Sequence, residues 1–470
     1  MLSKIVLVGA LALQVQTVYS QCQAKGSVLF AHKPTVGKGL SAHVVYNGLK
    51  KPRGIKFDDL SNLLVVDVGV GVVALTSKNS TDCMGWERKV VLENGDLNHG
   101  IELDGTSLFV STESEVLEYQ YNASSLSVSS GNPRTVVKGM KKPEGGHYTR
   151  TLVIQPSPNS TIIPHIIISR GSDGNVEPAA ADPATGTAQI RRFALHPSVP
   201  DGGYDWFQGQ LLASGIRNAV GMTLDKKNKL WSVENSVDEV TWNGKDVHTD
   251  NPAEELNVVD LNNISGASYG YPNCYTAWDM SSFSGPSTGG QFTAGSDNAS
   301  ISDAFCSNTT NVVPPALNFE AHVAPLDIKF YGGIKGNETE FGITRDWTND
   351  AFVSFHGSWN REPPAGYGVV RIPWSGDDSV PQAKSDSKTG YEYVVQAPDM
   401  NACPSGCIRP VGLEFDQLGR LFVSSDATGE VFVIEDGNSP DASWAISTGR
   451  PNISTRYLLS IALVSSWILL

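Results

Sequence analysis

A set of polar residues stands just before short apolar segments that recur along the chain. They are Arg53, Asn98, His99, His147, Arg217, Asn218 and Arg409. A guanidinium group binds a carboxylate through two parallel hydrogen bonds, so three arginines that meet would suit a small polyanion. A histidine among them is a natural proton acceptor near neutral pH. The set indicates a site that binds an anionic molecule and moves a proton.

Other catalytic patterns in the sequence do not have the context that they need. Residues 266–270 match the Gly-X-Ser-X-Gly motif of a nucleophile elbow, but Tyr271-Pro272 follows immediately and would stop the required helix. Residues 69–71 lack the third glycine of a dinucleotide fingerprint. The nine histidines have no zinc-ligand spacing. Residues 266–270 are therefore predicted to form a tight loop, and neither a dinucleotide site nor a zinc site is indicated.

The elements that position the polar set repeat six times. Each copy is an alternating apolar segment, often ending in Asp, then a turn and a second apolar segment. The copies are 54–58 with 63–67, 100–104 with 108–111, 152–155 with 166–169, 221–225 with 230–233, 326–330 with 351–354, and 412–416 with 421–424. Six units with loops of irregular length predict an all-β chain folded as a six-bladed β-propeller, with a β-sandwich as the alternative.

In a propeller, residues before the first strand of each blade gather at one end of the central channel. The polar set would therefore meet there.

The formal net charge of −14 argues against a nucleic-acid partner, which needs clustered Lys and Arg. Charged residues are 18% of the chain, below the average of about 25%, as expected of many short strands joined by turns.

Both ends of the sequence have the composition of processing signals. Residues 1–20 hold one lysine, an apolar run and small residues before position 20, which is typical of a secretory signal peptide. Residues 457–470 form an uncharged apolar tail after a polar spacer, 437–456, as in a glycosylphosphatidylinositol (GPI) lipid-anchor signal. A last strand or helix packed on the core is the alternative. Residues 21–436 are expected to form the propeller.

The cysteines and glycosylation motifs agree with export. The six cysteines predict disulfides rather than a metal site, and Cys403 and Cys407 are close enough in sequence to pair; the other pairings are left open. Asn-X-Ser/Thr motifs occur at Asn79, Asn122, Asn159, Asn263, Asn298, Asn308, Asn337 and Asn452. We therefore expect a secreted glycoprotein.

Longer motifs give the chain a resemblance to a known family. They cover residues 51–54, 146–154, 215–221, 269–272, 355–361 and 408–413. Over most of residues 45–436 the chain resembles the glucose/sorbosone dehydrogenases, and within them the fungal pyranose dehydrogenases that use pyrroloquinoline quinone. The resemblance implies oxidation of a pyranose or keto-aldose sugar with this quinone and Ca²⁺. It also implies an external electron acceptor, either a haem protein or a copper oxygenase.

The resemblance assigns roles to individual residues. His147 matches the general base that takes the hydroxyl proton of the sugar, and Arg217 matches the arginine that polarises the reacting quinone carbonyl. Further quinone contacts are implied at Arg53, Asn98, His99, Asn218, His356, Trp359, Arg361 and Arg409. His356 departs from the bacterial glucose enzymes, which have a lysine near this position. Backbone carbonyls of Asn235 and Ser236 are implied as calcium ligands, in a loop shorter than the bacterial one.

Two other functions remain open on the sequence alone. A calcium-dependent lactonase or esterase could use the same fold, but it needs acidic and Asn side chains converging on one metal. The inner positions found here hold arginines and histidines instead. A non-catalytic propeller that binds glycans or proteins is the second alternative. The identity of the sugar is not fixed by the sequence, because loops of irregular length build that pocket.

Overall fold

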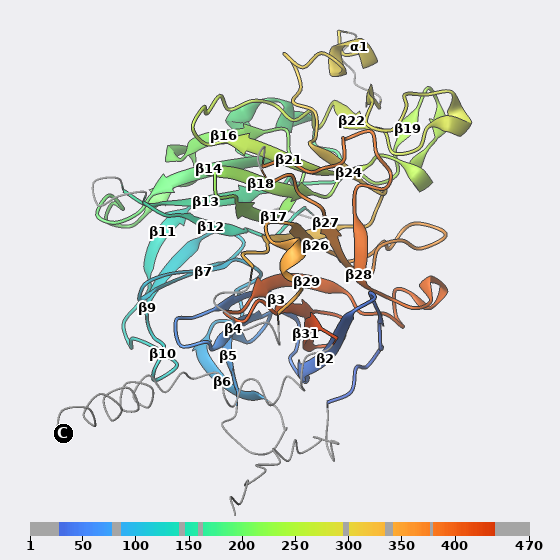
Figure 1. Cartoon of the computed structure of the whole chain (residues 1–470). Coiled ribbons are helices and arrows are strands. Elements are labelled where there is room, and N and C mark those ends of the chain that lie inside the picture. Colours follow the sequence, from blue (N-terminus) through green and yellow to red (C-terminus); the bar gives the residue numbers. More distant parts are fainter. Residues whose placement is uncertain are drawn as a thin grey trace, which may run out of the picture.

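Alternating apolar segments and polar turns fold into antiparallel hairpins, so the described chain is nearly all strand and loop (Figure 1). The computed structural model describes residues 28–77, 86–140, 146–157, 163–294, 300–333, 342–376 and 379–437. Within them the only α-helix is α1 (Asp303–Cys306). Short 3-10 helices span Pro178–Ala181, Pro183–Thr185, Trp206–Gln208, His248–Asp250, Ser281–Phe283, Arg345–Trp347 and Met400–Ala402.

The hairpins belong to six sheets of four to six strands, here called blades 1 to 6. Blade 1 contains β3 (Pro52–Phe57), β4 (Leu63–Asp67), β5 (Gly71–Ser77) and β6 (Trp86–Glu93). Blade 2 contains β7 (Ile101–Asp104), β8 (Ser107–Ser111), β9 (Val116–Asn122), β10 (Ser127–Val128), β11 (Arg134–Lys138) and β15 (Tyr204–Asp205). Blade 3 contains β12 (Leu152–Gln155), β13 (His165–Arg170), β14 (Gln189–Ala194) and β16 (Gln210–Ser214).

The second half of the chain forms the other three blades. Blade 4 contains β17 (Ala219–Leu224), β18 (Lys229–Glu234), β21 (Glu254–Asp260) and β24 (Leu317–Phe319). Blade 5 contains β25 (Pro325–Phe330), β26 (Ala351–Phe355), β27 (Gly368–Ile372), β28 (Glu392–Gln396) and β1 (Thr35–Val36). Blade 6 contains β29 (Pro410–Phe415), β30 (Leu421–Ser425), β31 (Glu430–Asp436) and β2 (Leu40–Tyr46). Two small ribbons lie outside the blades, β19 (Thr241–Trp242) with β20 (Lys245–Asp246) and β22 (Cys274–Thr276) with β23 (Gln291–Thr293).

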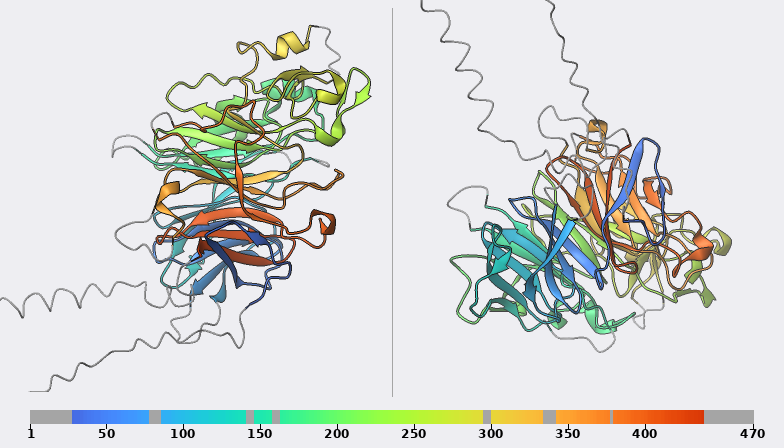
Figure 2. Two further views of the ribbon diagram at one scale, coloured as in Figure 1. Left: turned by 45° about the vertical axis from the view of Figure 1, so that its right-hand side comes forward. Right: turned by 90° about the horizontal axis from the view of Figure 1, so that it is seen from below.

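The blades close into a ring. The first strand of each blade packs against that of the next, in the order β3, β7, β12, β17, β25, β29 and β3 again. Figure 2 shows blade 1 (blue) beside blade 6 (red). Strand β2 closes the ring by pairing antiparallel with β31. In this pairing Leu40 lies opposite Asp436. The predicted six-bladed propeller is confirmed, and each predicted unit is the inner hairpin of one blade.

Apolar side chains fill the layers between neighbouring blades. Blades 4 and 5, for example, share a cluster that includes Trp231, Phe319 and Val353. All five residues of β4 are buried, because blades on both sides cover its two faces. This arrangement explains why second strands such as residues 63–67 are nearly all apolar. The core therefore holds each hairpin rigidly, and with it the residues at the hairpin ends.

Several smaller predictions can be placed on this fold. Cys403 pairs with Cys407 as predicted, and Cys274 pairs with Cys306. Cys22, Cys83 and the predicted terminal signals lie outside the described residues. Residues 266–270 form a loop with no helix after them, as predicted. Within the described part, no helix is long and apolar enough to cross a membrane.

Candidate active site at the channel end

A cavity of about 380 Å³ opens where the inner hairpins begin and end. The first strand of an antiparallel hairpin starts at the same end at which the second strand finishes, so both groups of flanking residues face this cavity. Its lining residues are Arg53, His147, Arg217, Asn218, Asn235, Ser236, Asp238, Glu254, His322, Ala324, Leu326, His356, Gly357, Trp359, Asn360 and Arg409. The volume lies in the range of small-molecule sites, roughly 300–1,000 Å³.

His147 is held at the cavity wall by the loop after β13. Its Nδ1 lies 3.0 Å from the carbonyl oxygen of Ser172, which can only accept, so Nδ1 carries the hydrogen and Nε2 keeps a lone pair. Burial, followed by the charge of Arg217, lowers the pKa of His147 to about 3. Near neutral pH the ring is therefore a neutral proton acceptor.

The same loop brings His147 and Asn218 together through a glycine. A Cβ at Gly171 would lie 2.7 Å from the His147 Cβ and 2.8 Å from the Asn218 Oδ1. Real Cβ atoms do not approach other atoms this closely, so any side chain at this position would push the two residues apart. Gly171 thus allows a histidine and an amide to line the cavity side by side.

Arg217 uses every N–H of its guanidinium within the protein. Nε and Nη2 donate to the Asn175 carbonyl and side-chain oxygens at 2.9 and 2.8 Å, and Nη2 also reaches Asp238 at 3.4 Å. Nη1 donates to the carbonyls of Asn235 at 3.1 Å and Ser236 at 2.5 Å. These two carbonyls are the predicted calcium ligands. A contact from Arg217 to a quinone would require one of these bonds to be exchanged.

The carbonyls of Asn235 and Ser236 fit a hard cation. They already converge on a positive group, and oxygen is the ligand atom that calcium prefers. Acidic groups lie beside them: the buried Glu254 accepts from the Ser236 N–H at 2.6 Å, and the half-buried Asp238 accepts from Asn360 at 2.8 Å. Burial raises the pKa of Glu254 to about 8. Asp238 also lines the cavity.

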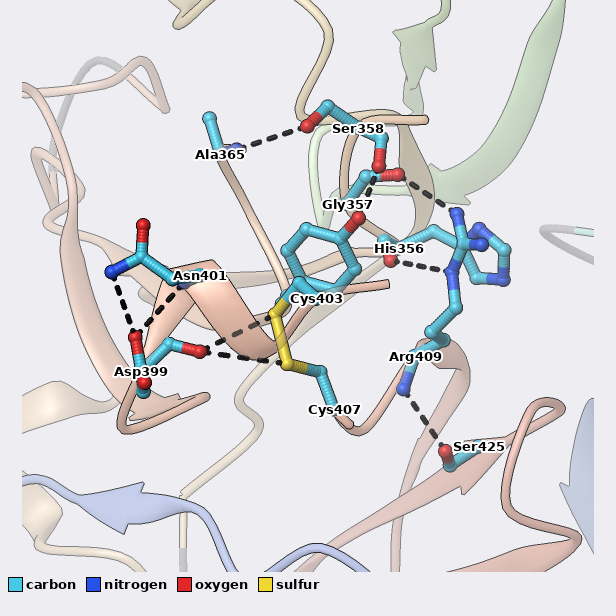
Figure 3. The surroundings of a disulfide bond; sticks show 11 residues. His356, Gly357, Ser358, Ala365, Asp399, Asn401, Cys403, Cys407, Arg409 and Ser425 are labelled. Carbon is cyan, nitrogen blue, oxygen red and sulfur yellow. Dashed lines mark hydrogen bonds between the residues drawn. A yellow bond between two sulfur atoms is a disulfide. The ribbon is translucent and has the colours of Figure 1, made fainter. Parts of the chain in front are cut away.

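The opposite wall is built by blades 5, 6 and 1. Arg409 donates from Nε to the His356 carbonyl at 3.2 Å and from Nη2 to the Gly357 carbonyl at 2.9 Å (Figure 3). The guanidinium also lies over the ring of Tyr367, 5.6 Å from its centre. The Cys403–Cys407 disulfide lies just before Arg409 in the chain and packs with Tyr367. The side chain of Arg409 is thus supported on one face and points to the cavity with its remaining N–H groups.

Nine predicted site residues line this cavity, and three do not. His99 is buried behind Arg53, where burial and then the Arg53 charge lower its pKa well below the ordinary value. Asn98 donates to the Tyr148 carbonyl at 2.7 Å. Arg361 pairs with Asp250 at 3.0 Å and Glu320 at 2.8 Å. The structure therefore places Asn98, His99 and Arg361 outside the lining, where a direct quinone contact stays a prediction.

Sequence reasoning missed acidic and polar residues of the same wall. They are Asp238, Glu254, His322 and Asn360, together with Asp426 behind Arg53 and His356. Asp238 and Asp426 follow the second strands of blades 4 and 6. The repeat pattern could have indicated these two, because residues after each second strand lie at the same end as those before each first strand. Glu254 begins β21, the third strand of blade 4, and Asn360 lies in a loop, so neither belongs to the two-strand unit that the repeat pattern describes.

Comparisons with known proteins agree with this geometry. The TrAA12-like family model matches residues 34–437. A "Pyrroloquinoline quinone-dependent sugar dehydrogenase" of Hypocrea jecorina is 37% identical over 421 residues, which are 86% of this chain and 91% of the relative. A "Pyrroloquinoline quinone-dependent pyranose dehydrogenase" of Coprinopsis cinerea is 34% identical over 87% of this chain. The chain spans about half of that relative, 55% of its length.

Solved structures show the same fold. The calcium structure of a Trichoderma reesei enzyme of Carbohydrate-Active Enzymes Family AA12 has a TM-score of 0.77 at 36% identity, covering 88% of this chain and 100% of that one. The holo form of the pyranose dehydrogenase PQQ domain from Coprinopsis cinerea has a TM-score of 0.77 at 34% identity, covering 88% and 99%. The family resemblance read from the sequence motifs is thereby confirmed, and the chain belongs to the TrAA12-like family.

Proposed function

We propose that this chain is a secreted quinoprotein dehydrogenase that oxidises a pyranose or keto-aldose sugar with pyrroloquinoline quinone and calcium. The observation that carries the proposal is the convergence of Arg53, Arg217 and Arg409 with His147 on one cavity. Such a site suits a small anionic cofactor beside a proton acceptor. The names of the two fungal relatives and the holo structure of the related domain support this quinone.

Each residue of this chain has a separate task in the proposed reaction. The Nε2 lone pair of His147 accepts the hydroxyl proton of the sugar, while Ser172 holds the ring through Nδ1. When bound, the quinone supplies the hydride acceptor. Arg217 stabilises negative charge near that acceptor, and Arg409 binds a carboxylate. Loop and strand ends fix His147 and Arg409 before any ligand arrives, which favours preorganised catalysis, whereas Arg217 has to exchange one of its present hydrogen bonds.

Calcium is proposed at the carbonyl oxygens of Asn235 and Ser236. The related calcium structure supports this ion, and the two oxygens already hold a positive group. For the lactonase alternative, several acidic side chains would have to converge on one metal. Within the described residues, no group of three or more His, Cys, Asp or Glu is placed to hold one. The structure therefore gives no specific observation in favour of that alternative.

Secretion, glycosylation and a lipid anchor are part of the proposal. Asn122, Asn263 and Asn308 are exposed, as glycosylation requires, and the other motifs lie outside the described residues. The sequence patterns at the two ends support export and anchoring. The electrons are proposed to leave to an external acceptor, a haem protein or a copper oxygenase.

Reconstitution tests this function. The purified protein is stripped with a chelator and then assayed for dye reduction across a panel of sugars. We expect activity only when both the quinone and calcium are restored. Activity with a nicotinamide cofactor alone, or no activity on any sugar with both components present, would overturn the proposal.

A further inference from the structure

Asp426 is a buried carboxylate that joins three blades at the wall of the cavity. It follows β30 of blade 6, and its side chain is only 6% exposed. Oδ1 lies 2.8 Å from Nε2 of His356 in blade 5, and Oδ2 lies 2.9 Å from Nη1 of Arg53 in blade 1. Both partners line the cavity, so the conformation of two lining side chains depends on this one group.

The charge state of Asp426 determines which ring nitrogen of His356 carries the hydrogen. Burial alone would raise the pKa of Asp426, but the hydrogen bond from His356 and the charge of Arg53 bring it well below the ordinary value. Asp426 is therefore ionised and can only accept hydrogen bonds. The contact at 2.8 Å consequently requires a hydrogen on Nε2 of His356.

The second ring nitrogen of His356 is then an acceptor. Burial lowers the pKa of His356 to about 4 even beside Asp426, so the ring is neutral near neutral pH and Nδ1 keeps its lone pair. Arg409 binds the backbone carbonyl of His356 and not the ring. No partner for Nδ1 is found among the residues that the structure describes. A lysine at this place could only donate, so the histidine reverses the polarity of the contact.

We propose that Asp426 is a positioning residue that fixes His356 as a hydrogen-bond acceptor, so that Nδ1 binds a hydroxyl group of the molecule in the cavity. The inference rests on the proposed function, which offers two sources of such a hydroxyl, the sugar and the reduced quinone. A carbonyl or carboxylate oxygen is disfavoured at this position, because it would face a lone pair. His356 therefore contributes selectivity for a hydroxyl group over a carbonyl or carboxylate oxygen, and it adds no charge to the cavity.

The hydrogen position is tested by nitrogen-15 NMR on the full-length protein without ligands. The His356 signals are identified by their loss in His356→Gln. We expect the Nε2–H form in the wild type. In Asp426→Asn the charged Arg53 should take the amide oxygen and turn the NH₂ group toward His356, which moves the hydrogen to Nδ1. Asp416→Asn is the matched control, because Asp416 binds Arg420 at the opposite end of the same blade.

Either of two NMR results would overturn the proposal. One is an Nδ1–H form in the wild type, and the other is an unchanged Nε2–H form in a folded Asp426→Asn protein. Asp426→Ala serves as a second variant if the asparagine protein does not fold, and it should lose the single tautomer. Because these spectra need no quinone, their result does not depend on whether the chain proves to be a dehydrogenase.

Binding measurements identify the hydroxyl and test the polarity. His356→Gln can donate to Asp426 and still offer an acceptor, whereas His356→Lys offers only donors. If the sugar is the source, the lysine variant should raise its KM by about ten-fold. If the reduced quinone is the source, the lysine variant should lower the affinity for the reduced relative to the oxidised form by about the same factor. Equal behaviour of the two variants in both assays would contradict an acceptor role.

These assays also separate the inference from the proposed function. A wild-type protein that binds no quinone with calcium would remove the dehydrogenase proposal, whatever the NMR spectra show. A wild-type protein that is active but carries the hydrogen on Nδ1 of His356 would remove only the role of Asp426.

Discussion

His147 is the residue on which the proposed chemistry depends most. It is held through Nδ1 by Ser172, and its free nitrogen is the proposed proton acceptor. A general base contributes roughly 10²–10⁴ in rate. We expect His147→Ala to lower turnover at saturating quinone by about that factor while the quinone dissociation constant changes little. Near-normal turnover, or a defect confined to quinone binding, would show that another residue is the base.

The low pKa of His147 gives a pH dependence. Because burial lowers this pKa to about 3, the neutral base persists from pH 8 down to about pH 4 and is lost only below that. We therefore expect that protonation of His147 causes no decline of kcat near pH 6. The pH profiles of the wild type and His147→Ala should have the same shape in this range. A wild-type decline centred at the ordinary histidine value, about 6.5, would show that the ring is not desolvated in the working enzyme.

Arg409 is expected to affect quinone affinity rather than turnover, the opposite of His147. Its guanidinium donates hydrogen bonds to two backbone carbonyls and lies over the Tyr367 ring, which leaves N–H groups for an anionic ligand. A hydrogen bond to a charged group contributes about 1.5–3 kcal/mol. Arg409→Ala should thus weaken quinone binding by about ten- to over a hundred-fold and leave turnover at saturating quinone nearly intact. Isothermal titration with calcium present measures the first quantity, and a larger fall in turnover than in affinity would contradict the assignment.

At the level of elements, the loop after β18 is where Arg217 would compete with the proposed calcium ion. Arg217 donates hydrogen bonds to the two carbonyls that are proposed as calcium ligands. Removing this charge in Arg217→Met should tighten calcium binding to the quinone-free protein by about ten-fold or more. Arg134→Met at the outer edge of blade 2 is the control with the same charge change. Equal calcium affinity in the two variants would place the ion elsewhere.

The loop after β13 makes a steric prediction. A methyl group at Gly171 would collide with His147 and Asn218, whereas the nearest atom to one at Gly174 lies 3.8 Å away. Displacement of a catalytic group by about 1 Å can cost on the order of 10²-fold in rate. Gly171→Ala should therefore lower kcat/KM by about ten- to a hundred-fold, and Gly174→Ala should not. Matching thermal unfolding of both variants would show that the loss is local, and equal activity would mean that the loop adapts.

At the scale of the whole molecule, the sequence predicted the inner hairpins but not the outer strands. Units such as 63–67 were recognisable because neighbouring blades bury both faces of the strand. Outer strands such as β15 and β24 are two or three residues long and carry too little pattern. The pairing of β2 with β31 joins the two ends of the chain and depends on closure of the ring, which no local pattern encodes.

The site was predictable to the same extent and for the same reason. Arg53, His147, Arg217 and Arg409 share a place in the repeat, so the propeller geometry alone brings them together. Asp426 and Asp238 occupy the complementary place after second strands and were overlooked. Arg361 was identified through the motif, and the structure places it outside the cavity lining, paired with Asp250 and Glu320.

Reduction of the bound quinone by sugar in a single turnover tests the central claim most directly. The protein is loaded with quinone and calcium, kept without any electron acceptor, and mixed with an oxidisable pyranose while the quinone absorption is followed. We predict complete reduction of one quinone per chain, slowed by about 10²–10⁴ in His147→Ala. A bound quinone that stays oxidised with every sugar, or is reduced equally fast in His147→Ala, would contradict the account.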